Sequence, residues 1–294
     1  RWDKRVMVPK ANYGLGKQFP RFGDVVAVCD VDQKRLTRAG EIVKEWSSAP
    51  PMQCGDYRKV IDDNSIDVVH IVTPDHWHAK IAVEAMLSGK DVYCEKPMTL
   101  TIGEGQLIRE VQQKTGAVFQ VGTQQRSTGQ FIKAVAMIRD GRLGTIKRVV
   151  CGIDSSPESP RLMQAPPPAH LDWDRWLGPA PKSEYRYQSG ANNIMKEWSN
   201  GHYEFRWWYD FSGGKLTDWG AHHVDIATWG MGKTDTGPVL VDPVMVEHPV
   251  EFKDGQPARD DCYNTATRFL INATYADGME LSIRHDTDNG ILFE

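Results

Sequence analysis

The sequence predicts an α/β domain followed by an α+β domain in a chain of 294 residues. Short β-branched runs alternate with helical patterns up to about residue 124, which is typical of βαβ units and a parallel sheet. The alternation then stops, and the last third of the chain carries alternating strands with turns, which predict a largely antiparallel, open sheet. We therefore expect domains at residues 1–124 and 125–294.

The parallel sheet is predicted from four apolar runs in the first domain. Each run is short, rich in Val and Ile, and stopped by polar residues or proline, as expected of strands buried on both faces. These strands are expected at 25–30, 66–72, 91–95 and 118–121. Helical patterns follow the first three strands, at 32–46, 76–87 and 101–114.

The second domain has a different pattern of elements. It begins with a helical pattern and one strand, continues through a proline-rich loop, and reaches a helix that ends near Gly230. The later strand-like runs are joined at one point by an Asp277-Gly278 turn, a good hairpin signal. We expect the early helix at 130–139, the early strand at 144–152, and the later strands at 239–241, 244–247, 266–275 and 279–284.

Composition excludes several classes of function. The chain has 35 Lys+Arg against 39 Asp+Glu, and because no basic cluster stands out, a nucleic-acid partner is not expected. No apolar run is long enough for a membrane helix, so no membrane partner is expected either. Five scattered cysteines form no CxxC pair, which predicts no metal site and favours the cytoplasm over the periplasm, with export left open.

Asp30 is the first residue that points to a ligand. Ligands of parallel sheets bind at the carboxyl ends of the strands, and Asp30 ends the strand at 25–30. In a Rossmann domain, an acid at this place accepts hydrogen bonds from the adenosine ribose and repels a 2′-phosphate, which favours NAD. An acid that only caps the next helix is the alternative, and position alone leaves both open.

A glycine-rich phosphate loop is not recognisable before Asp30. Gly14-Leu15-Gly16 lacks the third glycine, and Pro9 stands where a strand should precede such a loop. A helix and its loops can use all the residues before Val25, since a full βαβ unit needs about 30 residues. The chain also starts without Met, so we expect the first strand and its phosphate loop to precede Arg1.

The densest polar cluster of the second domain follows Gly213-Gly214. Asp218 and His222 are four residues apart, so they share one face of a helix. A carboxylate beside a histidine can hold the ring as a general base, whereas a capping Asp beside a surface His is the alternative. The adjacent His222 and His223 cannot both face one metal ion from a helix, so no metal is expected.

Tryptophans gather in the second domain. Seven of the ten lie between residues 173 and 229. Flat aromatic faces with polar edges suit sugar rings, but they are also ordinary core material, and both interpretations stay open. Arg206 and Tyr209, with Tyr203, precede the helix of Asp218 and also favour a polar ring as substrate.

The chain resembles the Gfo/Idh/MocA family of nicotinamide-dependent oxidoreductases. Four motifs carry this resemblance, in the family's order and spacing. The resemblance implies a Rossmann domain followed by an open, largely antiparallel sheet, which commonly supports homodimers or homotetramers. The motifs are Ala27-Val28-Cys29-Asp30-Val31-Asp32, Thr73-Pro74-Asp75-His76-Trp77-His78, Glu95-Lys96-Pro97, and Gly213-Gly214 with Asp218 and His222.

The resemblance also implies roles for individual residues. The expected catalytic residues are Lys96, Asp218 and His222. His78 matches a frequent family position, with helix packing as its alternative role. Expected cofactor contacts are Asp30, Thr73, Pro74, His76, Glu95, Lys96 and Gln124, and expected substrate contacts are Lys96, Arg206, Tyr209, His222 and His223.

The expected activity is hydride transfer between NAD and a hydroxyl carbon of a sugar, polyol or sugar derivative. Two alternatives stay open. Some relatives cleave glycosides by transient oxidation with a retained NAD, followed by elimination. A non-catalytic sugar or cofactor sensor would keep the fold alone, since fold does not fix function.

Overall fold

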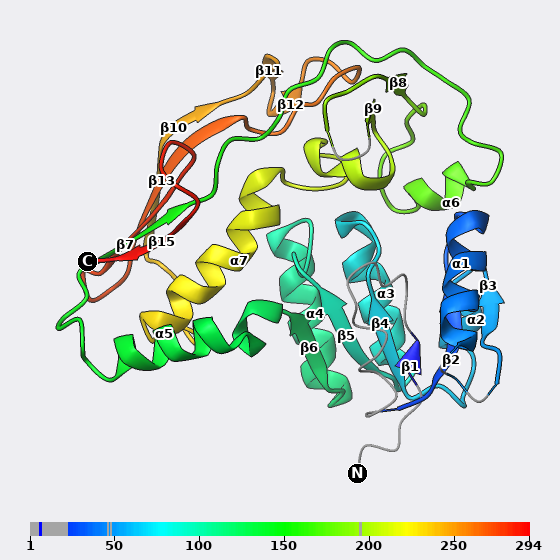
Figure 1. The fold of residues 1–294 in the computed structure, drawn as a ribbon, viewed down its shortest axis with the longest axis horizontal. Helices are drawn as coiled ribbons and strands as arrows, with labels where there is room; N and C mark the ends of the chain where they lie inside the picture. Colours follow the sequence, from blue (N-terminus) through cyan, green and yellow to red (C-terminus); the bar gives the residue numbers. More distant parts are fainter. Residues whose placement is uncertain (1–5, 8–22, 46, 48, 194–195) are drawn as a thin grey trace. The chain divides into compact units, whose positions relative to one another are not determined.

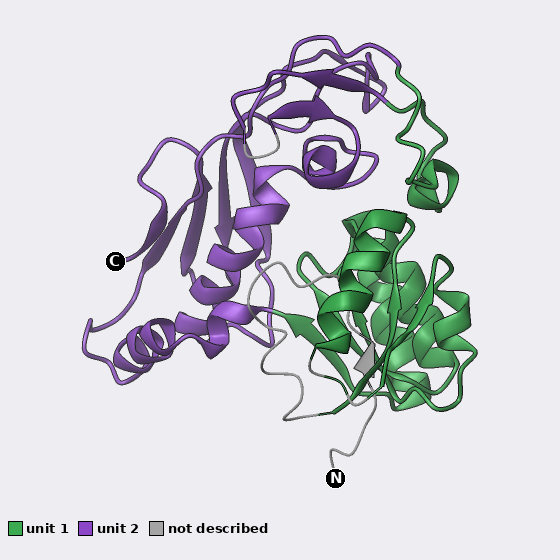
Figure 2. Cartoon of the chain, turned by 45° about the vertical axis from the view of Figure 1, so that its right-hand side comes forward, with its two compact units in different colours: residues 1–122, 165–185 green, residues 123–164, 186–294 purple. Residues whose placement is uncertain are grey.

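The computed structural model describes residues 6–7, 23–45, 47, 49–193 and 196–294. The chain packs as two compact units (Figure 2). Unit 1 comprises Arg1–Gly122 and Ala165–Tyr185, and unit 2 comprises Thr123–Gln164 and Arg186–Glu294. The first break lies close to the one expected after residue 124, but the sequence pattern did not indicate that Ala165–Tyr185 returns to unit 1.

The main sheet of unit 1 has six parallel strands in the order β3-β2-β1-β4-β5-β6 (Figure 1). This is the strand order of a doubly wound Rossmann sheet. All strands run in the same direction, but the order in which the chain adds them reverses between β1 and β4. The expected fold class of the first domain is therefore confirmed. The strands are β1 (Val6–Met7), β2 (Val25–Cys29), β3 (Met52–Cys54), β4 (Val68–Ile71), β5 (Asp91–Glu95) and β6 (Phe119–Gly122).

The first strand corrects one expectation. Val6–Met7 pairs in parallel with both β2 and β4 and takes the central place of the sheet, so the expectation that this strand precedes Arg1 is wrong. Only two residues pair, too few for a recognisable apolar run, and Pro9 follows closely. The rejected phosphate-loop candidate, Gly14-Leu15-Gly16, lies outside the described residues.

Helices pack against the strands of unit 1. α1 packs against β2 and β3, and α3 packs against β4, β5 and α4 (Figure 1). Thr101 and Glu104 form a reciprocal capping box that fixes the start of α4. The sequence pattern did not predict the short β3 and α2, because neither shows a periodic pattern of apolar residues. The helices are α1 (Gln33–Lys44), α2 (Arg58–Ile61), α3 (Asp75–Leu87), α4 (Ile102–Thr115) and α6 (Trp173–Leu177).

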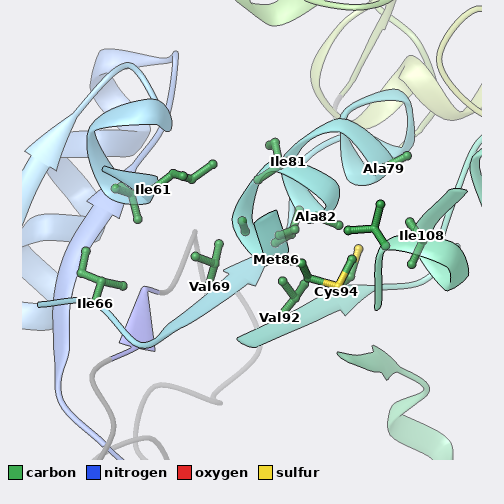
Figure 3. Close-up of a cluster of buried hydrophobic side chains, with 14 of the residues drawn as sticks. Ile61, Ile66, Val69, Ala79, Ile81, Ala82, Met86, Val92, Cys94 and Ile108 are labelled. Carbon is green, nitrogen blue, oxygen red and sulfur yellow. The ribbon is translucent and has the colours of Figure 1, made fainter. Parts of the chain in front are cut away.

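The core of unit 1 lies between the strands and these helices (Figure 3). Val69 and Val92, on neighbouring strands, are 1% and 2% exposed. Ala82 and Met86 on α3 pack into the same cluster. Full burial of such an aliphatic side chain contributes about 1.5–3 kcal/mol, which explains why continuous apolar runs form these strands.

The main sheet of unit 2 has the strand order β10-β13-β14-β7-β15. Its pairings are antiparallel except for β14 with β7, so the expected largely antiparallel sheet is confirmed. The strands are β7 (Arg148–Gly152), β10 (Leu240–Glu247), β13 (Arg268–Thr274), β14 (Glu280–Arg284) and β15 (Gly290–Phe293). Two small hairpins join β8 (Tyr187–Ser189) to β9 (Glu197–Ser199) and β11 (Phe252–Lys253) to β12 (Gln256–Pro257).

One long helix organises unit 2. α7 (Lys215–Gly230) packs against β7, β14 and β15, and also against α5 (Gly129–Arg139) and η3 (Gln124–Ser127) (Figure 1). The short η4 (His202–Trp207) precedes it. Among the described residues, no helix is both long enough and apolar enough to cross a membrane.

Candidate active site

The predicted cofactor contacts of unit 1 lie at the carboxyl edge of its sheet. Asp30 follows β2, Thr73 and Pro74 follow β4, and Glu95 and Lys96 stand at the end of β5. Because all these strands are parallel, their carboxyl ends lie along one edge, beside the point where strand order reverses. The fold therefore brings these predicted residues to the place where such sheets bind ligands.

Asp30 does not cap the helix that follows it. Asp32 is the cap of α1, since its carboxylate accepts from the N–H groups of Lys34 at 2.9 Å and Arg35 at 3.2 Å. Asp30 instead accepts from the N–H of Asp32 at 2.9 Å, in a turn at the end of β2. An acid in this position suits the two hydroxyls of an adenosine ribose, so the described residues fit the adenosine end of NAD. Residues 8–22, between β1 and β2, lie outside the part of the chain described.

A second segment borders this edge. The strap, which we define as Ala165–Tyr185, packs as part of unit 1. The N–H of Gln33 donates to the carbonyl of His170 at 2.8 Å, and the N–H of Asp172 donates to Val31 at 3.1 Å. His170 Nδ1 also lies 3.1 Å from the Asp32 carboxylate. The strap is therefore attached where β2 leads into α1.

The strap is also attached to the start of α3. The carbonyl of Trp176 accepts from His76 Nε2 at 3.0 Å and from Trp77 Nε1 at 2.9 Å. Gly178 has φ +49°, and a Cβ there would lie 1.9 Å from the Trp77 ring, so only glycine fits. His76, predicted as a cofactor contact, thus has one ring nitrogen bound to the strap.

Three of the seven clustered tryptophans are structural. Trp176, Trp207 and Trp208 are 5%, 7% and 3% exposed. The indole N–H of Trp207 donates to Glu204 and that of Trp208 donates to the carbonyl of Ser199. Trp219 on α7, by contrast, is 39% exposed, and it directly follows Asp218. The core interpretation therefore holds for these three buried rings, and Trp219 is the one we keep as a candidate sugar platform.

His78 joins the ends of two strands. Its Nδ1 donates to the carbonyl of Pro97 at 2.7 Å, and its Nε2 lies 2.9 Å from the carbonyl of Thr73. The side chain is 1% exposed. His78 packs in α3, as the alternative interpretation held, and it also fixes the segment that carries Lys96.

Replacing His78 with Phe is expected to lower the free energy of unfolding by about 1–3 kcal/mol, because the buried ring loses its hydrogen bonding to the carbonyls of Pro97 and Thr73. We also expect kcat to fall more than NAD affinity does, since the segment beside Lys96 loses its support. His285→Phe is the matched control, because His285 Nδ1 lies 3.0 Å from the Phe269 carbonyl in unit 2. Chemical denaturation and steady-state kinetics measure both effects. An unchanged kcat in a destabilised His78 variant would leave this residue a packing role alone.

The predicted catalytic residues of unit 2 lie on α7. Gly214 precedes the helix with φ +69°, and a Cβ there would lie 2.7 Å from Thr265, which explains the glycine in the motif. The N–H of Lys215 donates to Ser156 Oγ at 3.1 Å and fixes the first turn. Asp218 lies in that turn, and His222 follows one turn later.

Asp218 lies beside a predicted substrate contact. Arg206 Nε is 3.6 Å from Asp218 Oδ1, and their side chains are 25% and 17% exposed. The guanidinium also lies 4.4 Å from the centre of the Tyr203 ring and donates to the Tyr203 carbonyl. Arg206 therefore places a fixed positive charge beside the proposed catalytic carboxylate.

An ion pair that the sequence did not indicate joins η3, the segment that contains Gln124, to α7. Arg126, two residues later in η3, makes a bidentate pair with Asp225 of α7, at 2.8–3.0 Å. Its guanidinium also lies 5.4 Å from the centre of the Trp229 ring. Asp225 and Trp229 continue the helix face of Asp218, so η3 is held against the face that carries the candidate residues. Nothing local in the sequence signals this partnership across the unit.

Two predicted substrate contacts have structural partners in unit 2. The Tyr209 hydroxyl accepts from the N–H of Ala266 at 3.1 Å and hydrogen-bonds with His248 Nε2 at 3.1 Å. His223 Nδ1 donates to the carbonyl of Gly152 at 3.0 Å, and burial lowers the pKa of His223. We therefore leave both residues out of the proposed mechanism.

Two family models match the chain. Residues 10–123 match an oxidoreductase family with an NAD-binding Rossmann fold, and residues 158–290 match the C-terminal alpha/beta domain of that oxidoreductase family. The chain belongs to the Gfo/Idh/MocA oxidoreductase family. The recognition made from the four sequence motifs is thus confirmed.

Individual relatives of this Gfo/Idh/MocA chain include a dehydrogenase and a glycosyl hydrolase. Inositol 2-dehydrogenase from Salmonella typhimurium is 31% identical over 122 residues, which cover 41% of this chain and 35% of the relative. A glycosyl hydrolase family 109 protein from Shewanella putrefaciens is 38% identical over 96 residues, which cover 31% of this chain and 21% of the relative. The matched region thus spans about a third or less of these curated relatives.

A solved structure extends the likeness to nearly the whole chain. Aldose-aldose oxidoreductase from Caulobacter crescentus, crystallised with glycerol, superposes with a TM-score of 0.66 at 17% identity. The superposition covers 98% of this chain and 72% of that one. This likeness shows the shared fold of the family.

Proposed function

We propose that this Gfo/Idh/MocA protein transfers a hydride between NAD and a hydroxyl carbon of a sugar, polyol or sugar derivative. One observation carries the proposal. The doubly wound sheet of unit 1 places Asp30 and Lys96 along its ligand-binding edge, in a chain whose helix α7 carries Asp218 and His222 on one face. The family and its inositol 2-dehydrogenase relatives support it.

The proposed roles follow from charge and proton transfer. NAD supplies the hydride acceptor at its nicotinamide ring. His222 accepts the proton of the substrate hydroxyl as a general base. Negative charge then develops on that oxygen, and the Lys96 ammonium stabilises it more in the transition state than in the ground state. Asp218, held beside Arg206 in unit 2, orients the substrate or the histidine.

A panel of polyols, aldoses, sugar acids and aryl glycosides tests the activity. Incubation with NAD should give NADH and an oxidised sugar in equal amounts for at least one compound. No NADH and no sugar product across the panel, from a protein that binds NAD, would favour the sensor alternative.

A second activity rests on the glycosyl hydrolase family 109 relatives. In that reaction the cofactor stays bound, the substrate is oxidised only transiently, and the net product is a cleaved glycoside. Release of the aryl group without accumulation of NADH would establish this activity instead. The same panel therefore separates the two enzymes.

Replacing Asp30 with Ala is expected to raise the Kd for NAD about 10- to 100-fold, because hydrogen bonds to a charged acceptor contribute about 1.5–3 kcal/mol. The preference for NAD over NADP should also narrow, since the charge that repels a 2′-phosphate is removed. Asp24→Ala is the matched control, because Asp24 is exposed at the opposite end of β2. Titration calorimetry measures both constants. Tighter binding of NADP than NAD by the unaltered protein would contradict the ribose assignment.

We further propose a homodimer or homotetramer formed through β10. This edge strand has several exposed apolar side chains, with Leu240, Val241 and Val244 at 59%, 56% and 52%. A second copy of the chain would cover them. Val241→Glu should lower the mass found by analytical ultracentrifugation, whereas Ile102→Glu, at an exposed apolar position of unit 1, should not. A monomer in the unaltered protein would overturn this proposal.

The cysteines support a reducing compartment, for which we propose the cytoplasm. All five are free thiols, and four of them are buried. Proteins of oxidising compartments more often pair such residues in disulfides.

A further inference from the structure

Cys29 and Cys54 lie side by side at the carboxyl edge of unit 1. Cys29 is the last residue of β2, Cys54 is the last of β3, and the two are direct partners in the parallel register. Paired residues of neighbouring strands project from the same face of a sheet. Cys54 Sγ also lies 3.9 Å from the carbonyl of Val28.

The spacing of the pair permits a bond. Neighbouring strands lie about 4.8 Å apart, and disulfides join Cα atoms about 4.4–6.8 Å apart. The end of β3 can shift with little loss, because only three residues of that strand pair with β2. The remaining cysteines, Cys94, Cys151 and Cys262, lie on other elements and share no such register.

The environment activates one of the two sulfurs. The Cys29 thiol and the N–H of Asp56 hydrogen-bond to Cys54, and together with the charge of Lys59 they lower the pKa of Cys54 to about 7. The same interaction, with burial, raises the pKa of Cys29. A thiolate is the nucleophilic form of cysteine, so a reactive sulfur and a resolving thiol stand next to each other.

We propose that Cys29 and Cys54 form a reversible disulfide in response to a peroxide. The Cys54 thiolate attacks the peroxide, a sulfur–oxygen bond forms as the oxygen–oxygen bond breaks, and hydroxide leaves. Cys29 then attacks the sulfenic sulfur, the sulfur–oxygen bond breaks, and water leaves with the proton of the thiol. Two thiols are oxidised and one hydrogen peroxide is reduced to two waters. A dithiol reverses the bond by exchange.

The disulfide between Cys29 and Cys54 would change the proposed cofactor site. Asp30 follows Cys29 directly, and its N–H donates to the carbonyl of Cys54 at 3.2 Å. Drawing the ends of β2 and β3 together therefore moves the carboxylate that we assign to the adenosine ribose. This consequence rests on the proposed function, whereas formation of the disulfide does not.

Peptide mapping tests the bond itself. After treatment with hydrogen peroxide and alkylation, we expect a peptide pair linked through Cys29 and Cys54, two hydrogens lighter than the reduced peptides. Dithiothreitol should return both to the alkylated form. Cys54→Ser should give no linked peptide, and Cys262→Ser, the control, should leave the linkage unchanged. Alkylation of both residues after oxidation, or oxidation to sulfinic acid without a link, would overturn the proposal.

Titration of NAD tests the consequence. We expect the Kd for NAD to rise at least about tenfold on oxidation and to recover with dithiothreitol. The oxidised and reduced forms of Cys54→Ser should bind NAD equally. A linked peptide with unchanged NAD affinity would overturn the coupling to the cofactor site. Failure of the reduced protein to bind NAD would overturn the coupling and the proposed function together, and the peptide map would still decide whether the bond forms.

Discussion

Replacing Lys96 with Met is expected to lower kcat by about a thousandfold, while the Kd for NAD changes by less than about threefold. Met keeps the length and apolar stem of the side chain but has no charge and no proton to share. Removal of a single group that stabilises charge on oxygen in a transition state costs about 10²–10³ in kcat, and loss of a proton relay adds to it. NAD affinity should persist, because Asp30 and the rest of the carboxyl edge stay in place.

The matched control is Lys80→Met. Lys80 is exposed on α3 in the same unit and pairs with Glu84 one turn later, so its loss should leave kcat unchanged. Turnover of the best substrate from the panel and calorimetric titration of NAD give the two readouts. Retention of full turnover by the Lys96 variant would remove this residue from the mechanism. Loss of NAD binding in step with turnover would move it to the cofactor site.

The place of Lys96 in the fold could be predicted because its signals are local. β5 is an apolar run that ends in Glu95, and the structure gives it the predicted bounds. β2 is also an apolar run that the sequence predicts, although the strand ends one residue earlier than expected. In both strands every residue is buried or half-buried on the sheet, so the run itself specifies the strand.

Other parts of the fold depend on partners that are distant in sequence. β1 pairs through only two residues, and the sheet on both sides of it defines it as a strand. The strap has the composition of a loop, and it belongs to unit 1 through contacts such as the hydrogen bond from Gln33 to His170, across 137 positions of the chain. Such long-range pairs have no periodic trace in a single sequence.

The candidate site divides in the same way. Lys96, Asp218 and His222 lie in compact motifs and were named from them. The bidentate pair of Arg126 with Asp225 was not, since the two residues are far apart in the chain and each alone resembles an ordinary surface charge. For Tyr209, the sequence position suggested a role that the structure does not indicate. Its place before α7 favoured a substrate contact, but its hydroxyl is bonded within unit 2.

The second large effect is expected at His222. Replacing it with Asn should lower kcat by about 10²- to 10⁴-fold, the usual contribution of a positioned general base. Asn keeps a polar group of similar reach but cannot accept a proton at neutral pH.

The neighbouring residue provides the control for His222. His223 is 5% exposed, and its Nδ1 donates to the Gly152 carbonyl of β7. His223→Asn should therefore lower the free energy of unfolding by about 1–3 kcal/mol and leave kcat and its pH profile unchanged. Adjacent positions on one helix point in different directions, so the pair separates loss of catalysis from loss of packing. Equal loss of kcat in both variants would show that α7 acts only through its packing, and the general-base assignment would fail.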